Sequence, residues 1–123
     1  MFIKENVNPE KKKTGDCVIR AIAKAEGKPW LVVFDSLVDI ARKTYSSPSY
    51  KDVYGMYLGR YKKVTATYAE NGKKKYYTVG QVAKWDGTYI INVRKHLTTV
   101  IDGNIYDIWD TTHKKALNIW KAR

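Results

Sequence analysis

The sequence predicts an α+β domain, with helices in its N-terminal half packed on an antiparallel β-sheet formed by its C-terminal half. Apolar residues recur at helical spacing between residues 16 and 63, and short runs rich in β-branched and aromatic residues follow from residue 64. A chain of 123 residues, 44% of them hydrophobic, can bury one core but not two. We therefore expect residues 1–123 to form a single domain.

Two N-terminal helices carry the clearest periodicity. The first is predicted from about Asp16 to Glu26, with Thr14 as its N-cap and Gly27 as its stop. The second begins at Pro29. The apolar face of the first helix consists of Val18, Ala21, Ile22 and Ala25, and that of the second of Trp30, Val33, Phe34, Leu37, Ile40, Ala41 and Thr44.

The remaining elements are shorter. A third helix is predicted within residues 47–63, after a Ser-Pro start signal, with Val53, Met56, Tyr57 and Arg60 at helical spacing. Residues 64–69 are predicted as a strand, residues 70–75 as a turn, and residues 78–85 as a short helix capped by Thr78. Further strands are predicted at residues 88–93, 96–101, 105–109 and 116–122.

The turn after residues 96–101 decides which acidic residue shares a face with His96. Asp102-Gly103 is a strong signal for a two-residue hairpin turn, centred either there or one residue later. In either register, residues 96, 98 and 100 share a face with residues 105, 107 and 109. Asp107 then lies on the His96 side and Asp110 on the other, whereas a three-residue turn would reverse this choice.

The formal charge of +11 favours anionic partners such as acidic proteins, anionic polymers or nucleic acid. The lysines are scattered among predicted turns, which indicates a basic soluble surface more than a specific nucleic-acid site. No apolar run reaches the length of a signal peptide or a membrane span, so we expect a cytoplasmic protein without a membrane partner.

Cofactor signals are absent from the sequence. One Cys and two His support neither a disulfide framework nor a zinc site. The glycines at positions 55 and 59 lack the Lys and Ser/Thr of a phosphate-binding loop. We expect no metal and no organic cofactor.

Cys17 stands where a polar turn becomes a helix, and this position has two interpretations. A free Cys is often a small buried hydrophobe. A helix N-terminus also favours the thiolate, although the charge of Asp16 beside it opposes ionisation. An activated thiol also needs a His to share its proton and an acidic residue to orient that His. Later in the chain His96 can play the first role, and Asp107, or alternatively Asp110, can play the second.

The stretches GDCVIRAI and HLTTVIDGNIYDIWD resemble the papain-like cysteine peptidases, in a compact form similar to bacterial and phage-encoded members. The resemblance implies a papain-like fold and a Cys17-His96-Asp107 triad, with Asp107 in place of the usual Asn. Trp109, two residues later, would shield the Asp107–His96 hydrogen bond from water. The implied function is a peptidase or amidase that forms a thioester acyl-enzyme on a peptide or protein substrate, for which the net charge favours acidic partners.

One position departs from the family pattern. Papain relatives usually carry a Gln six residues before the Cys to bind the oxyanion, and Lys11 stands there in this chain. Asn8 or Asn6 could supply an amide donor, and the backbone N–H of Cys17 is a further donor. The missing Gln favours the alternative of a non-catalytic basic binding module, including a decayed papain-like fold.

Overall fold

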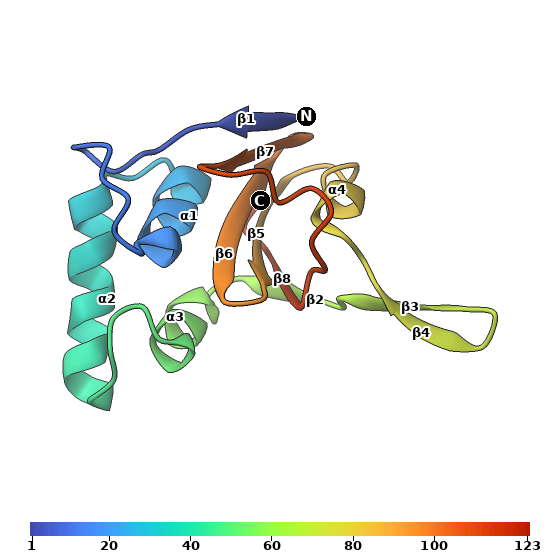
Figure 1. The fold of residues 1–123 in the computed structure, drawn as a ribbon. Helices are drawn as coiled ribbons and strands as arrows, with labels where there is room; N and C mark the ends of the chain where they lie inside the picture. Colours follow the sequence, from blue (N-terminus) through green and yellow to red (C-terminus); the bar gives the residue numbers. More distant parts are fainter.

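The computed structural model of the chain describes residues 1–123 and places a six-stranded sheet at its centre (Figure 1). In spatial order the strands are β1 (Phe2–Lys4), β7 (Asn104–Asp107), β6 (His96–Ile101), β5 (Thr88–Val93), β8 (Asn118–Lys121) and β2 (Lys62–Val64). The expected α+β class is confirmed. The sheet is mixed rather than purely antiparallel, because β1 pairs in parallel with β7.

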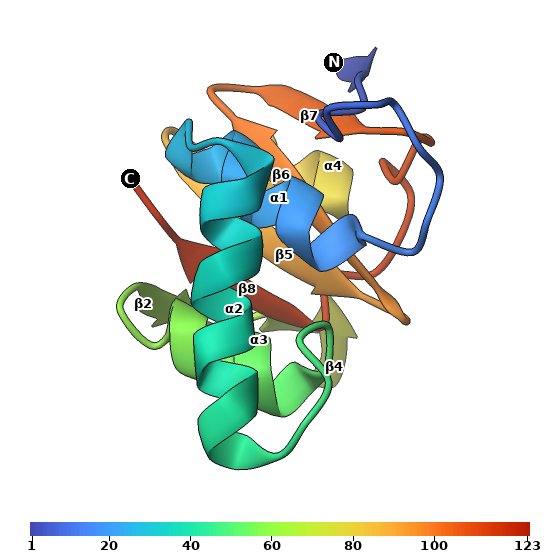
Figure 2. The same ribbon diagram turned by 90° about the vertical axis from the view of Figure 1, so that its left-hand side faces the viewer.

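Three helices cover one face of this sheet, as Figures 1 and 2 show. They are α1 (Cys17–Glu26), α2 (Trp30–Thr44) and α3 (Lys51–Leu58). α1 packs directly against β5, β6 and β7, and α2 packs against both α1 and α3. No helix combines the length and the apolar character that a membrane span requires.

The sheet divides the hydrophobic interior into two clusters, one on each face, whereas the chain length predicted a single core. Ile90, Leu97 and Trp120 point towards the three helices, whereas Ile91 and Val100 point to the opposite face. This division follows from the alternation of side chains along each strand. The short helix α4 (Val79–Val82) covers the opposite face, and its predicted Thr78 cap is confirmed by a reciprocal capping box with Gln81.

The predicted stop of the first helix is confirmed at Gly27, which adopts the left-handed conformation (φ 65°). The second helix begins directly after Pro29, its N-cap. Thr14 as N-cap is wrong: Asp16 occupies that position, without a side-chain capping bond. The third helix is shorter than predicted. Met56, predicted at helical spacing with Val53 and Tyr57, is 61% exposed.

Residues 64–76 fold differently from the prediction of one strand and a turn. The segment around Val64 forms β2, and β3 (Thr67–Glu70) pairs with β4 (Lys73–Tyr76) in a two-stranded ribbon that projects from the body (Figure 1). Its turn consists of Asn71 and Gly72, both at positive φ. Every residue of β4 is exposed, so no alternation of polarity marks this strand in the sequence.

The two-residue turn between β6 and β7 is confirmed. Asp102 and Gly103 both have positive φ, and Ile101 lies opposite Asn104, Val100 opposite Ile105 and Thr99 opposite Tyr106. This register places Asp107 on the same face of the sheet as His96, as the turn chemistry predicts.

Candidate active site

Cys17 is the first residue of α1 and is partly buried. The helix start is held by Asp16, whose buried carboxylate accepts hydrogen bonds from Arg20 Nε (2.7 Å), Trp30 Nε1 (2.9 Å) and Asn8 Nδ2 (3.0 Å). Burial by itself raises the pKa of Asp16, but these three donors outweigh burial and lower it. The carboxylate therefore stays ionised and fixes where α1 begins.

His96 is the first residue of β6, and its imidazole is held on two sides. Its Nε2 lies 2.7 Å from Oδ2 of Asp107, and its ring packs against Trp109 with 4.8 Å between ring centroids. The side chain is only 10% exposed. Since Nε2 is engaged by Asp107, Nδ1 is the ring nitrogen that remains for a second contact.

The pKa values of Cys17 and His96 move in opposite directions. Burial raises the pKa of the Cys17 thiol, but hydrogen bonding to His96 and to the Leu97 backbone, together with nearby positive charge, lowers it below its ordinary value. Burial lowers the pKa of His96, but hydrogen bonds with Asp107 and Cys17 raise it to about 9. The charged forms of Cys17 and His96 therefore favour each other.

Asp107 is buried at the end of β7 and keeps its charge. Burial raises its pKa, but hydrogen bonding to His96 and the charge of that ring lower it. Its Oδ1 accepts from the backbone N–H of Ile108 (2.7 Å) and from Arg20 Nη1 (3.3 Å). Asp107 thus orients His96 through one oxygen while its other oxygen is anchored to backbone and to α1.

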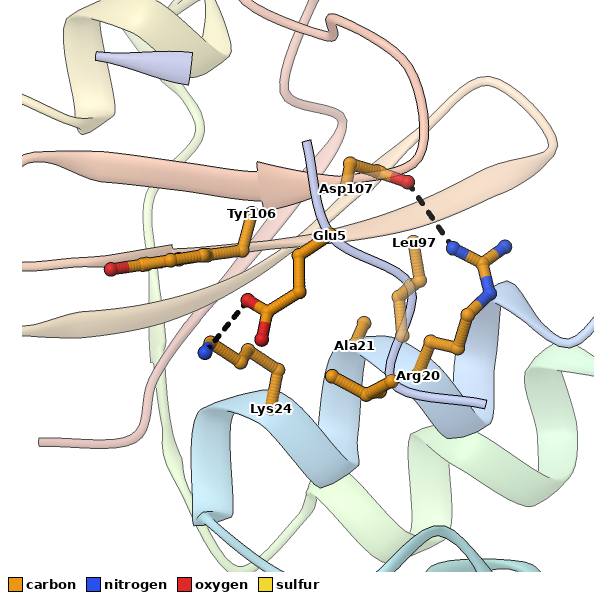
Figure 3. Close-up of a pocket in the computed structure, with 8 residues that line it drawn as sticks. Glu5, Arg20, Ala21, Lys24, Leu97, Tyr106 and Asp107 are labelled. Carbon is orange, nitrogen blue, oxygen red and sulfur yellow. Dashed lines mark hydrogen bonds and ion pairs between the residues drawn. The ribbon is translucent and has the colours of Figure 1, made fainter. Parts of the chain in front are cut away.

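Arg20 connects the two buried carboxylates, as one guanidinium contacts both Asp16 and Asp107. Figure 3 shows the contact with Asp107 beside a cavity of about 10 Å³, large enough for about one water. An ion pair between Lys24 and Glu5 (2.8 Å) lies across the same cavity. This role of Arg20 is not among the features predicted from the sequence, although the i, i+4 spacing of Asp16 and Arg20 is a signal for it.

The alternative site residues lie apart from this constellation. Asp110 is exposed and accepts hydrogen bonds from the backbone and side chain of Thr112, so it stabilises the turn after β7. No hydrogen bond or ion pair joins it to His96. His113, the other histidine of the chain, is also exposed.

The predicted amide donors are used within the loop that precedes α1. Asn8 Nδ2 donates to Asp16, and Asn6 Nδ2 donates to the carbonyl of Lys12 (3.0 Å). Neither Asn8 nor Asn6 lines the cleft at Cys17, and neither does Lys11, whose Nζ donates to the Asn6 carbonyl. The backbone N–H of Cys17 lies in the first helical turn, where N–H groups have no intrahelical acceptor.

A cleft of about 440 Å³ opens at Cys17 and His96. Its walls come from the start of α1, the start of α3 and the β5–β6 turn. Tyr50, Tyr54 and Leu117 supply apolar surface beside the two polar side chains. The volume and the mixture of apolar and polar walls are typical of substrate sites.

No family model, curated protein or solved structure matches this chain in sequence or fold comparisons.

Proposed function

We propose that the protein is a cysteine hydrolase of the papain-like type, a peptidase or amidase that acts through Cys17, His96 and Asp107. The observation that carries the proposal is the position of the His96 ring, with Nε2 held 2.7 Å from a buried carboxylate in the cleft that Cys17 also lines. A surface histidine has no need of a buried, charged partner. In a thiol enzyme this partner keeps the ring oriented and stabilises its charged form.

The proposed reaction begins with attack of the Cys17 thiolate on the carbonyl carbon of an amide. The backbone N–H of Cys17 donates to the oxyanion of the tetrahedral intermediate. As the carbon–nitrogen bond breaks, the His96 imidazolium gives its Nδ1 proton to the departing amine, which leaves a thioester on Cys17 and a neutral imidazole.

Hydrolysis of the thioester completes the cycle. Neutral His96 removes a proton from water as the water attacks the thioester carbonyl. Collapse of the second tetrahedral intermediate releases a carboxylic acid and regenerates the Cys17 thiolate beside the imidazolium. Asp107 remains ionised throughout, and Trp109 packs on the ring and limits access of solvent to the His96–Asp107 hydrogen bond.

The test measures acyl transfer and thiol reactivity on the same protein. With p-nitrophenyl acetate as a generic acyl donor, we expect acetylation of Cys17 by intact mass and continued release of p-nitrophenol as the thioester hydrolyses. At about pH 6 we also expect faster alkylation of Cys17 in the folded than in the unfolded protein. His96→Ala should reduce both rates by at least about tenfold, since the thiol pKa rises when the imidazole is lost.

His113→Ala is the matched control, because it removes the only other histidine from an exposed position. Overlapping rates for the wild type and His96→Ala would refute the dyad. Acetylation that stops after one equivalent would refute hydrolysis and leave only a reactive thiol.

A basic binding module is the second candidate, and the β3–β4 ribbon favours it. The ribbon projects from the body and carries three consecutive exposed lysines, Lys73 to Lys75, of which Lys75 pairs with Glu70. A basic two-stranded ribbon can contact an anionic polymer. This candidate accounts for the ribbon but leaves the buried His96–Asp107 pair without a role, so we rank it second.

A further inference from the structure

Two further hollows extend the cleft of Cys17 into a groove. The first, of about 280 Å³, shares Lys51, Tyr54 and Asn92 with the cleft. The second, of about 430 Å³, shares Lys63 and Asn118 with the first. The groove therefore runs from the thiol past α3 and β8 to the base of the β3–β4 ribbon.

Cationic side chains line the whole groove. Lys51, Arg94 and Lys95 surround the cleft, and Lys63 and Lys74 line the further hollows. None of these five is engaged in an ion pair. The one acidic residue of the lining is Asp52, in the middle hollow. Unpaired charges of one sign along a concave surface attract an anionic ligand.

We propose that the substrate is an acidic polypeptide, bound along this groove with its scissile amide at Cys17 and its carboxylates beside the lysines and Arg94. This inference rests on the proposed function, because a thiol that forms thioesters needs an acyl carbonyl, which a nucleic acid does not offer. The apolar surfaces of Tyr50, Tyr54 and Leu117 line the same cleft as three of the cations and suit the side chains of a peptide. The carboxylates come either from Asp and Glu side chains or from a free C-terminus.

The first experiment measures the charge of the cleft without any substrate. Cys17 is alkylated with iodoacetate, an anion, and with iodoacetamide, a neutral analogue, and the ratio of the two rates is compared among variants. A nearby unit charge changes the rate of an anionic reagent by roughly twofold at low ionic strength. We therefore expect the ratio to fall about eightfold in a triple variant, Lys51→Gln with Arg94→Gln and Lys95→Gln.

The matched control is Lys84→Gln, because Lys84 is exposed, lies next to α4 on the opposite face of the sheet and does not line the groove. It should leave the ratio unchanged. Iodoacetamide rates should change by less than about twofold in all variants, since the thiolate and His96 are retained. An equal fall of the ratio in the control would refute a local effect of the groove.

The second experiment asks which anion the groove binds. Four alanine-based peptides are used to protect Cys17 from iodoacetamide. Three are blocked at both ends: one has internal Glu residues, one has internal Lys residues and one is neutral. The fourth is blocked only at its N-terminus and carries a free C-terminal carboxylate. We expect the Glu peptide or the carboxylate peptide to protect at a concentration at least about fivefold lower than the Lys peptide. The better of the two identifies the source of the carboxylate.

Equal protection by all four peptides would refute the proposal, and so would stronger protection by a single-stranded oligonucleotide than by either acidic peptide. Failure of the proposed function has a different signature. In that case Cys17 reacts no faster in the folded than in the unfolded protein with either reagent, while the iodoacetate-to-iodoacetamide ratio still reports the charge of the cleft.

Discussion

Replacement of Arg20 by Met tests whether the buried guanidinium holds the candidate site together. The side chain of Arg20 is 8% exposed, and those of its partners Asp16 and Asp107 are 3% and 2% exposed. Removal of one partner from a buried ion pair costs about 3–5 kcal/mol, because a buried charge is left without its counter-charge. Asp16 retains two other donors and Asp107 retains His96, so we expect a loss of about 3 kcal/mol, at the lower end of this range.

The free energy of unfolding is measured by urea denaturation near neutral pH, followed by tryptophan fluorescence and circular dichroism. Arg42→Met is the matched control, since Arg42 lies 3.6 Å from Asp39 and both side chains are largely exposed. This surface pair should contribute less than about 1 kcal/mol.

An Arg20→Met variant within about 1 kcal/mol of the wild type, or no less stable than Arg42→Met, would refute the reasoning. Arg20→Lys keeps the positive charge but loses the two-sided contact, so it should lie between the wild type and Arg20→Met. If Arg20→Met does not fold, a measurable loss in Arg20→Lys still tests the same contact.

Two further outcomes follow from the site. Asp107→Ala should lower the rate of Cys17 alkylation in the folded protein at about pH 6 by at least about tenfold, because Asp107 contacts His96. Asp110→Ala, which removes no contact of His96, should change this rate by less than about twofold. The reverse ranking would contradict the choice of Asp107 over Asp110 as the partner of His96. In Cys17→Ala, where the opposite titration of the thiol is absent, the free energy of unfolding should fall by at most about 3 kcal/mol as pH rises from about 6.5 towards 9, because the pKa of His96 is raised in the folded protein and the stability this contributes is lost as the ring deprotonates. Adding His96→Gln to this variant should abolish the pH dependence. A free energy of unfolding that rises over this pH range would refute the reasoning.

The elements that depend on near neighbours in the chain were open to sequence analysis. Apolar spacing predicts α1 and α2, and Gly27 ends α1 because it adopts a positive φ at little cost. The Asp102-Gly103 turn has the same local origin, and its length selects Asp107 over Asp110 through the two-residue period of strands. The identities of Cys17, His96 and Asp107 as site candidates therefore came from local chemistry and their order in the chain.

Contacts between distant segments were decided only by the tertiary structure. The three residues of β1 carry no distinctive pattern, and their parallel pairing with β7 depends on where the two strands meet in the sheet. The same holds for Arg20, whose contact with Asp107 follows from packing of α1 against β7. Local sequence determines which conformation a segment prefers. Which buried charges face each other depends on how the helices and the sheet pack, because a buried charge loses its contact with water and needs an opposite charge or a hydrogen-bond partner from another element.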